Sequence, residues 1–408
     1  MIVAPCTVVT GGDDPRVIED AAVRVVGAHI AQVGPAGEVA AAHPDDTLWP
    51  ARGRVLMPGF VNTHAHLARH LARGLGLSGP EAWRRYDRAL SAEDVRWAAT
   101  AALVEGVRHG VTTVCDFHRS ESCLDLSLSE VLAAARQVGV RVATCYGAAE
   151  HDAPGERRAA FEESASVAAG SARGHEGRLR GMIGVQATSL AGMNALMDRA
   201  LEHAAGRLAV HVELGLDLTP GERWQKGRAW DDRRPAALWA HAEAAPRDLL
   251  GAAQERGDAL SAVGWGASAA LAREAEVAWG SDALLNAPPI SEAAAGWVTG
   301  ARARLHYRRL FVNGPQWASR YFGEGLGTIA AGAPADLVLA DYRAATEFSS
   351  RTLHEHLWSG LLRAPISGVM VAGEPVVDNG VLITADESEV AARARECAAR
   401  VWGRIASR

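Results

Sequence analysis

The chain has 408 residues, and its 42 basic and 48 acidic side chains give a formal net charge of −6. This acidic balance argues against nucleic acid or an anionic membrane as a partner, and no apolar run approaches the ~20 residues of a membrane span. The five cysteines are scattered without a CxxC pair, and no basic, signal-like segment opens the chain, so we expect reduced thiols in a cytoplasmic protein.

Short strand-like segments occupy both ends of the chain. Residues 1–57 and 327–385 show alternating apolar and polar positions interrupted by turns, a pattern typical of half-buried antiparallel strands. We expect these two ends to pair into one small β-sandwich, followed by a terminal amphipathic helix over 386–406. The predicted domains are a composite of 1–57 with 327–408, and a second domain over 58–326.

The pattern changes between these ends to a repetition of strands and helices. Apolar strand-like runs alternate with alanine-rich stretches, which we expect to be helices at 92–109, 127–138, 156–172 and 190–205. Together with the run that ends at His66, the sequence offers eight strand candidates. Eight strands interleaved with helices predict an α/β protein with a (β/α)8 barrel rather than a doubly wound sheet.

The sharpest local motif is Asn62-Thr63-His64-Ala65-His66. Side chains alternate along a strand, so His64 and His66 point to the same side. At the carboxyl end of a barrel strand that side faces the mouth of the barrel, where catalytic residues gather. Two imidazoles presented there suit zinc or another borderline divalent metal.

Three further residues stand at the ends of later strand candidates: His211, His241 and Asp282. Any one of them alone is more often a structural residue than a ligand. As a set, in this order and at these strand ends, they point to one metal-binding mouth. The only lysine is Lys226, so a mechanism that needs a lysine must use it or be abandoned.

These motifs resemble the amidohydrolase superfamily. The resemblance starts at MPGFVNTHAH (57–66), continues through His211, His241 and Gly280-Ser281-Asp282, and covers nearly the whole chain. It extends to the stretches 86–90, 109–113, 138–141, 313–323 and 332–338. The chain is most similar to the SsnA-type aminohydrolases, relatives of guanine, triazine and adenosylhomocysteine deaminases. The resemblance implies a barrel flanked by a β-sandwich built from both termini.

The resemblance also implies a ligand set, in which His64, His66, His211 and Asp282 bind one divalent metal. Zn²⁺ is the expected ion, with Fe²⁺ and Mn²⁺ as alternatives. Asp282 would also deprotonate a metal-bound water, and His241 would ligate or hydrogen-bond that water. Binuclear members use a carboxylated lysine on the fourth strand; the stretch 179–187 contains none, so a mononuclear site is expected.

The sequence departs from the family near the fifth strand. Deaminases of this branch carry His-x-x-Glu there, but Leu214 stands at the place of the glutamate and Glu213 lies one residue earlier. Strand alternation puts Glu213 on the same side as His211. We favour a catalytic role for Glu213, as a proton donor to a leaving amine if burial raises its pKa, over pairing with an arginine or capping a loop.

Four other residues are predicted to contact the substrate. Gln186 replaces a family histidine on the fourth strand, and Trp265 stands where a family motif would follow the seventh strand. Arg73 matches a family position near the substrate, with a structural ion pair as its alternative. His118 lies past the second strand, where it could line the pocket.

We therefore interpret the chain as a mononuclear metal-dependent hydrolase that acts, in the manner of a deaminase, on a C–N bond of a small nitrogenous compound. One alternative is amide hydrolysis or ring opening, because Leu214 replaces the deaminase glutamate. Another is a metal-binding relative that has lost turnover. The expected partner is a small molecule; a homodimer is left open, and the sequence does not name the substrate.

Overall fold

The computed structural model describes residues 1–171, 177–204, 208–215, 224, 237–263, 276–283, 300–323 and 325–407. The chain separates into two compact units. We call the first the terminal unit: Met1–Val61, Gly106–Thr113 and Ala287–Thr384. We call the second the barrel unit: Asn62–Glu105, Val114–Asn286 and Ala385–Arg408. The domain boundaries expected from the sequence remain a prediction.

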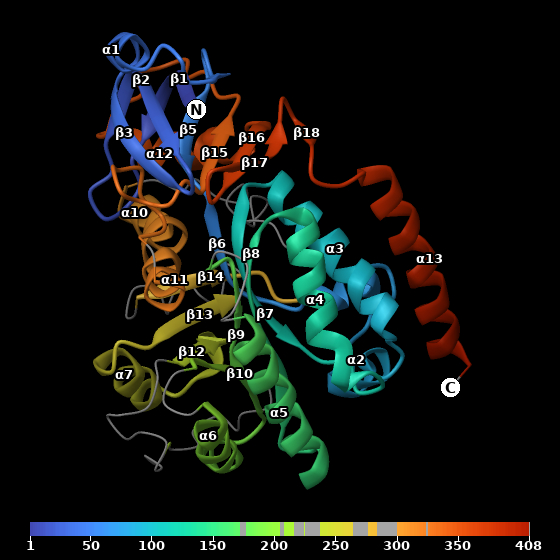
Figure 1. Cartoon of the computed structure of the whole chain (residues 1–408). Coiled ribbons are helices and arrows are strands. Elements are labelled where there is room, and N and C mark those ends of the chain that lie inside the picture. The colour runs from blue at the N-terminus through green and yellow to red at the C-terminus, as the bar shows by residue number, and fades with distance from the viewer. Residues whose placement is uncertain are drawn as a thin grey trace. The chain divides into compact units, whose positions relative to one another are not determined.

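The terminal unit is built on one nine-stranded mixed sheet. Its strands are β1 (Ile2–Val9), β2 (Val17–Val26), β3 (His29–Pro35), β4 (Leu48–Pro50), β5 (Val55–Pro58), β15 (Leu337–Ala340), β16 (Ile366–Val371), β17 (Glu374–Asp378) and β18 (Val381–Leu382). Strands from the two ends of the chain meet where β5 runs antiparallel to β15, with Leu56 opposite Leu339. The predicted β-module from both ends is therefore confirmed as a mixed sheet, seen at the top of Figure 1.

Helices complete the terminal unit: α1 (Ala36–Ala42), α10 (Gly300–Arg308), α11 (Gly314–Phe322), α12 (Leu353–Ser359), with the π-helical turn η5 (Arg309–Asn313) and the 3-10 turn η6 (Leu361–Arg363). One face of the sheet carries a core of buried aliphatic side chains, including Val3, Val23, Leu56, Leu337 and Met370. Burial of such side chains stabilises by about 1.5–3 kcal/mol each.

The barrel unit contains the predicted parallel barrel, and the structure confirms the fold. The hydrogen-bonded path runs β14-β13-β12-β11-β10-β8-β7-β6, and β9 pairs with β8. The strands are β6 (Phe60–Ala65), β7 (Val111–His118), β8 (Arg141–Ala149), β9 (Leu179–Gly181), β10 (Ile183–Ala187), β11 (Val210–Leu214), β12 (Ala237–Ala240), β13 (Ala259–Val263) and β14 (Val277–Gly280). A parallel bridge between Ala65 and Asp282 connects the two ends of the path, so the barrel is nearly closed.

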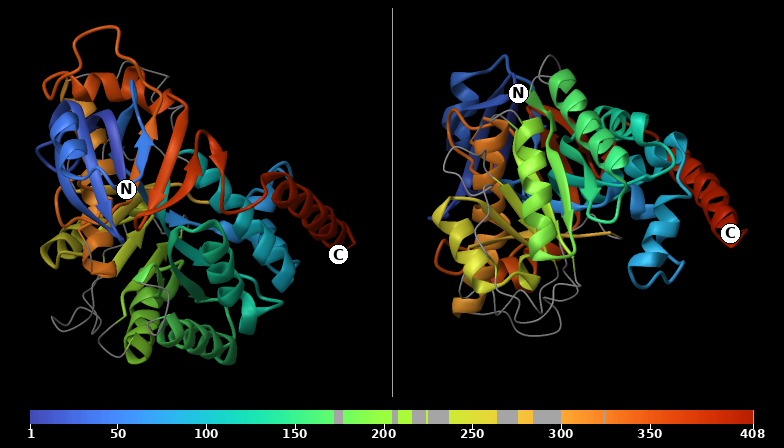
Figure 2. Two further views of the ribbon diagram at one scale, coloured as in Figure 1. Left: turned by 45° about the horizontal axis from the view of Figure 1, so that its top comes forward. Right: turned by 90° about the horizontal axis from the view of Figure 1, so that it is seen from below.

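Helices alternate with these strands, as Figure 2 shows from two sides. They are α2 (Pro80–Asp87), α3 (Ala92–Arg108), α4 (Leu124–Val138), α5 (Pro154–Ser171), α6 (Leu190–Ala204), α7 (Arg247–Glu255) and α13 (Glu387–Ala406), with the 3-10 turns η1 (Leu67–Ala72) and η4 (Ala242–Ala244). The four helices expected from alanine-rich stretches appear as α3 to α6. Gly139, at φ 87°, ends α4 in the left-handed conformation that glycine adopts without strain.

The last helix, α13, anchors the segment that leaves the first barrel strand. Asp386 begins α13 by accepting hydrogen bonds from the backbone N–H groups of Ser388 and Glu389. At the other end of α13, the indole N–H of Trp402 donates to the carbonyl of Leu71 over 2.9 Å. Arg404 Nε donates to the carbonyl of Ala89 over 2.7 Å, and its guanidinium pairs with buried Asp94. Residues near 402 therefore hold η1 and the end of α2 in place.

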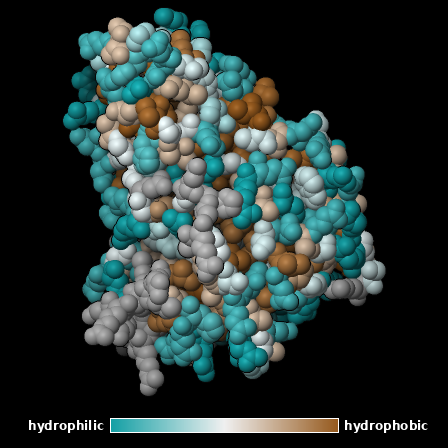
Figure 3. Space-filling model, in the orientation of Figure 1, coloured by the Kyte–Doolittle hydropathy of each residue, from teal (hydrophilic) through white to brown (hydrophobic). Residues whose placement is uncertain are grey.

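The surface carries scattered rather than continuous hydrophobic groups. Exposed large hydrophobic side chains include Val26, Leu48, Leu126, Val381 and Ile383, which belong to different elements. On the face drawn in Figure 3, brown hydrophobic residues form small groups among hydrophilic ones. Among the described residues, no helix has the length and hydrophobicity needed to cross a bilayer.

Candidate metal centre

The two histidines of the first strand lie in the buried interior of the barrel unit. His64 and His66 are both buried, and their ring centroids are 4.9 Å apart. Phe117, from β7, packs its ring against both imidazoles, at centroid distances of 6.1 and 5.7 Å. The alternation predicted for β6 is confirmed, because both imidazoles reach the same cluster.

Asp282 is tied by its backbone to these histidines. Its N–H donates to the carbonyl of His64 over 3.1 Å, and its own carbonyl accepts from the N–H of His66 over 3.2 Å. Its carboxylate Oδ1 lies 3.4 Å from His66 Nε2 and 3.9 Å from His64 Nε2. Asp282 has a positive φ of 61°, which is unusual for a non-glycine residue and recurs at functional sites.

The residues around Asp282 explain how the last strand approaches the first so closely. A Cβ on Gly280 would lie 2.9 Å from the Cβ of His64 and 2.6 Å from Ser261 Oγ, so only glycine fits there. Asn62 also binds the strand end: its Nδ2 donates to Ser281 Oγ over 2.8 Å. The sequence Gly-Ser-Asp is thus required by the closure of the barrel as well as by the site.

Strand β11 supplies His211 and Glu213, two residues apart on the same interior side. His211 Nε2 is 3.0 Å from Nδ1 of His64, and Glu213 Oε1 is 3.1 Å from Nε2 of His66. The strand continues to Leu214, so Glu213 is part of the site and not of a following loop. Burial by itself would raise the pKa of Glu213, but the charges of His66, Arg69 and His241 and the bond to His66 lower it overall. The raised pKa that a proton donor needs is therefore not found.

His241 follows β12 in the left-handed conformation, at φ 55°. Its Nε2 lies 3.8 Å from Asp282 Oδ1 and 4.0 Å from Glu213 Oε1. Its Nδ1 lies 3.3 Å from Oε1 of Glu243, whose other oxygen accepts from the N–H of Val263. Burial lowers the pKa of His241, but Glu243, Asp282 and Glu213 together raise it to about 9. His241 is therefore cationic near neutral pH.

His64 and His211 have the opposite charge state. Burial, followed by the neighbouring imidazoles, lowers the pKa of His64 well below its ordinary value. Burial likewise lowers the pKa of His211 to about 3. Neutral imidazoles are the form that binds metal ions.

The donor atoms of this cluster fit a divalent cation. His64, His66, Glu213 and Asp282 each offer one ligand atom, and these atoms lie within 4.8 Å of one another. His64 Nε2 is buried without a hydrogen-bond partner, which is costly for a polar atom unless something binds it. Nitrogen and carboxylate oxygen together are a donor set that zinc accepts. His211, predicted as a ligand, instead lies against His64 in this arrangement, and Glu213 takes its place in the group.

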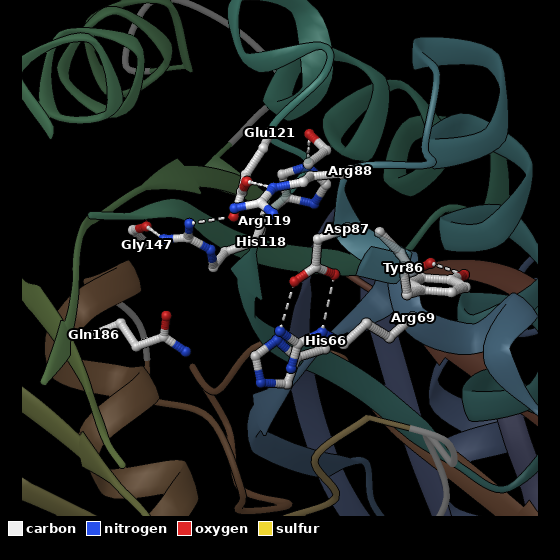
Figure 4. A network of polar contacts seen from close by, with 12 residues as sticks. His66, Arg69, Tyr86, Asp87, Arg88, His118, Arg119, Glu121, Gly147 and Gln186 are labelled. Atoms are coloured by element: carbon white, nitrogen blue, oxygen red, sulfur yellow. Dashed lines mark hydrogen bonds and ion pairs between the residues drawn. The ribbon is translucent and has the colours of Figure 1, made fainter. Parts of the chain in front are cut away.

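The wall next to the cluster is built from η1, α2 and the end of β7. Buried Asp116 accepts from the N–H of Leu67 over 2.9 Å and from Thr144 Oγ1 over 2.7 Å, which fixes the turn after His66. Burial raises the pKa of Asp116 to about 6. Figure 4 shows the guanidinium of Arg69 bound through two nitrogens to the carboxylate of Asp87.

The four residues predicted to contact substrate have different positions. Gln186 donates from Nε2 to Glu213 Oε2 over 2.9 Å, so it is in the site. His118 is buried at the end of β7 with Nε2 2.7 Å from Ser120 Oγ. Arg73 is about half exposed and pairs with Glu105 over 2.8 Å. Trp265 lies outside the described residues, as does Lys226.

Sequence reasoning gave no role to Arg69, Asp87, Asp116 or Glu243. The sequence does contain an indication for Glu243, because this residue stands two positions after the strand-end His241. Asp116 also stands two residues before His118 on one strand. Arg69 and Asp87 are 18 residues apart in irregular sequence, and no periodicity relates them.

Comparison with known proteins finds a family match over part of the chain. Residues 55–220 match the amidohydrolase family. A 5-methylthioadenosine/S-adenosylhomocysteine deaminase of Moorella thermoacetica is 32% identical over 197 residues, covering 47% of this chain but only 43% of that protein. A protein of the same name from Pelotomaculum thermopropionicum is 24% identical over 440 residues, and this alignment covers 99% of each chain.

Solved structures show the same fold. An adenosine deaminase from Xanthomonas campestris with bound zinc superimposes with a TM-score of 0.75 at 22% identity, covering 98% of each chain. An atrazine chlorohydrolase from Arthrobacter aurescens, complexed with zinc, gives a TM-score of 0.73 at 19% identity, over 97% of this chain and 99% of that one. These two matches show the shared fold. The family match over residues 55–220 and the similarity to deaminases together support a metal-dependent hydrolase related to the amidohydrolases.

Proposed function

We propose that the protein binds one divalent ion, zinc by preference, and hydrolyses a C–N bond of a small heterocyclic amine or amidine, with release of ammonia. The observation that carries this proposal is the buried group of His64, His66, Glu213 and Asp282 with ligand atoms within 4.8 Å of one another. The names of the relatives, which are deaminases of adenine nucleosides, support the choice of a nitrogen leaving group.

His64, His66 and Asp282 would hold the ion, because the sequence pattern and the geometry both select these residues. The remaining position is offered by Glu213 in this geometry and by His211 in the family pattern. When bound, the ion would supply the Lewis acidity that makes water a nucleophile near neutral pH. The absence of lysine from 179–187 supports a single ion.

Asp282 is proposed as the general base. Its side chain is the most open of the group, at 34% exposure, while its backbone is fixed to His64 and His66. A carboxylate in this position can take a proton from water without moving. His241 lies 3.8 Å from it and is cationic, so it can donate a hydrogen bond to negative charge that develops on the substrate.

Glu243 holds His241 in this role. Oε1 of Glu243 accepts a hydrogen bond from Nδ1 of His241. Nε2 of His241 therefore remains directed at Asp282 and Glu213. The second oxygen of Glu243 accepts from Val263 at the end of the neighbouring strand, which limits its freedom. A carboxylate that orients a histidine in this way is common around metal sites.

A second candidate, hydrolysis of an amide or opening of a lactam ring, is favoured by one observation. Glu213 is held ionised by His66 and Gln186, so it is prepared to accept a proton and not to donate one to a departing amine. In lactam opening the nitrogen leaves the carbonyl carbon but stays attached to the product, and the proton that Glu213 accepts from the attacking water can be returned to it. Glu213 has a place in both reactions as a proton acceptor near the reacting carbon.

One experiment separates these functions. Zinc-loaded protein is incubated with aminopyrimidines, aminotriazines, aminopurines, amidines and lactams, and both ammonia and consumption of the compound are measured. Ammonia with consumption supports the deaminase. Consumption of a lactam or amide without free ammonia supports the second candidate. Bound zinc without turnover of any compound would contradict both and favour a binding protein. Asp282→Asn with matched zinc content is the control for contaminating enzymes.

A further inference from the structure

Arg69 is a buried cation in the wall of the metal centre that the proposed function does not use. Its backbone N–H donates to the carbonyl of His66 over 3.0 Å, so it lies within one turn of a candidate ligand. Its side chain is 9% exposed. Burial lowers the pKa of Arg69, but Asp87, followed by Glu213 and Asp282, raises it overall, so the charge is retained and acts on the centre.

Asp87 occupies one edge of this guanidinium. Nε of Arg69 lies 3.2 Å from Oδ1 of Asp87, and Nη2 lies 2.9 Å from Oδ2. A guanidinium has five N–H groups in a fixed plane, and this bond uses the edge formed by Nε and Nη2. The edge formed by Nη1 and Nη2 remains. Among the described residues, the hydrogen bonds of the Arg69 guanidinium come from Nε and Nη2.

A second buried arginine in the same wall, Arg119, differs from Arg69 at this edge. Nη1 of Arg119 donates to the carbonyl of Gly147 and to Asp152 Oδ2, and its Nη2 donates to Asp152 Oδ1 and to Glu121. Protein acceptors thus fill the corresponding edge of Arg119, as Figure 4 shows in part. Two parallel N–H groups on one edge match the two oxygens of a carboxylate, and a buried pair of this kind is strong and directional.

One buried polar atom in this wall has no hydrogen-bond partner among the described residues. Nδ1 of His118 is buried and has no hydrogen-bond partner among the described residues, while its Nε2 faces Ser120. The charge of Arg69 acts on His118, as does that of His66, so the imidazole is within electrostatic reach of both. The unused Nη1 of Arg69 and the buried, unpartnered Nδ1 of His118, in the same wall, indicate a polar ligand that the chain does not itself provide.

Retention of the Arg69–Asp87 pair also needs a reason. Taking both charges out of water costs free energy, and apolar residues of similar volume often replace a buried ion pair without loss of stability. The pair is therefore weak evidence for a structural role. It is well suited to holding a guanidinium rigidly while one of its edges faces a ligand.

On the basis of the proposed function, we propose that the substrate is an anionic nitrogenous compound, a heterocyclic amine that carries a carboxylate. The carboxylate would bind the open edge of Arg69, while the carbon that loses nitrogen lies at the metal centre. His118 would contribute a further hydrogen bond from the same wall. Arg69 is thus a specificity-determining residue for this reaction.

The test uses pairs of compounds that differ only in this charge. Zinc-loaded protein is given aminopyrimidines, aminotriazines and aminopurines, each as a carboxylate and as the carboxamide of the same ring. Turnover is followed by loss of the ring amine, identified by mass spectrometry of the product, because a carboxamide can itself release ammonia, and binding is followed by titration calorimetry. We expect the carboxylate to be preferred by about 10- to 100-fold in kcat/KM and in Kd, the range for a hydrogen bond to a charged group.

The matched variant replaces the buried pair together, as Arg69→Met with Asp87→Leu, so that no lone charge stays buried. It should lose the preference for the carboxylate while zinc content is unchanged. Arg88→Met is the control, because Arg88 adjoins Asp87 in sequence but is half exposed and pairs with Glu121. Arg88→Met should keep the preference. If the double variant does not fold, the comparison of paired compounds on the unmodified protein decides.

The outcomes distinguish this inference from the proposed function. Equal turnover of the carboxamide and the carboxylate would overturn the role of Arg69 and would still support the proposed deaminase reaction. Calorimetric preference for the carboxylates without any turnover would support Arg69 and overturn the proposed reaction. Absence of both preference and turnover would overturn both.

Discussion

The backbone N–H of Asp282 lies 3.1 Å from the carbonyl oxygen of His64, so the carboxylate of the last barrel strand is fixed to the histidines of the first. These residues are 218 positions apart, yet the bond leaves little freedom between them. The base and two candidate ligands therefore form one rigid unit, and closure of the barrel is itself what assembles the site.

Asp282→Asn should reduce kcat by about 10²- to 10⁴-fold, because the amide keeps the size of the carboxylate but cannot accept the proton. Zinc content must be measured in the same samples, since the substitution also weakens a ligand. Asp248→Asn, an exposed position on α7, is the matched control and should retain full activity. Near-normal kcat with full zinc in Asp282→Asn would show that the residue is only structural.

Purified protein should hold about one divalent ion per chain, measured by elemental analysis. His64→Ala and His66→Ala should each abolish tight binding. His211→Ala should weaken it by about 10- to 100-fold, because His211 either ligates the ion or fixes the ring of His64. Two tightly bound ions per chain would contradict the argument from the missing lysine.

Glu213→Gln should lower kcat by about 10²-fold or more, because glutamine cannot accept a proton. Zinc content is measured in the same samples, because Glu213 also offers a ligand atom. The carbonyl oxygen of glutamine still faces His66, so the architecture is preserved. Unchanged kcat and KM on a confirmed substrate would remove Glu213 from the mechanism.

Much of this site follows from the sequence, because strand alternation is a local rule. It places His64 with His66 and His211 with Glu213 on common sides, and the structure confirms both pairs. The parallel barrel also follows, since the alternation of strands and helices is regular. Glu213 lies on the same side as His211, as alternation predicts, but the raised pKa that a proton donor requires is absent, because charges from other elements lower it.

The wall of the site was not predictable in the same way. Arg69 and Asp87 meet only because η1 and α2 fold against each other. Neither element has a repeating sequence pattern that would predict how the two pack together. The left-handed backbone of His241 is likewise imposed by tertiary structure, as alanine and glutamate follow it and neither signals a turn. Trp265 lies outside the described residues and stays a prediction.

Glu163, on α5, should make the protein less stable as pH rises. Burial, followed by the charge of Asp125, raises the pKa of Glu163 from 4.5 to about 7. The folded state therefore binds the proton more tightly than the unfolded state, so this destabilisation is absent below pH 4.5 and grows until pH 7. Glu163→Gln should raise Tm at pH 8 by about 1–2 °C and have little effect at pH 4.5.

The control for Glu163 is the adjacent Glu162, which is exposed and pairs loosely with Arg158. Glu162→Gln should change Tm very little at either pH. Equal effects of the two substitutions across this pH range would contradict the assignment to Glu163.

Arg404→Ala should destabilise the protein by about 1–3 kcal/mol, because Asp94 is fully buried and would lose the closer of its two guanidinium partners, keeping only Arg400 at 3.5 Å. Arg393→Ala is the matched control on the same helix, since Arg393 is half exposed and pairs only with Glu396 among the described contacts. Chemical denaturation measures both. KM for a confirmed substrate should rise in Arg404→Ala while zinc content stays constant, because Arg404 supports the wall and not the ligands.

The anchoring of η1 by α13 also constrains the order of events during synthesis. The ribosome delivers the histidines of β6 early, but Trp402 and Arg404, which fix the segment after them, emerge more than 300 residues later. A nascent chain can therefore assemble barrel strands, and bind metal ions, before the wall that carries Arg69 is in place. On the proposed role of Arg69, selectivity for the substrate would be acquired only when α13 has docked, after the candidate metal-binding residues have been made.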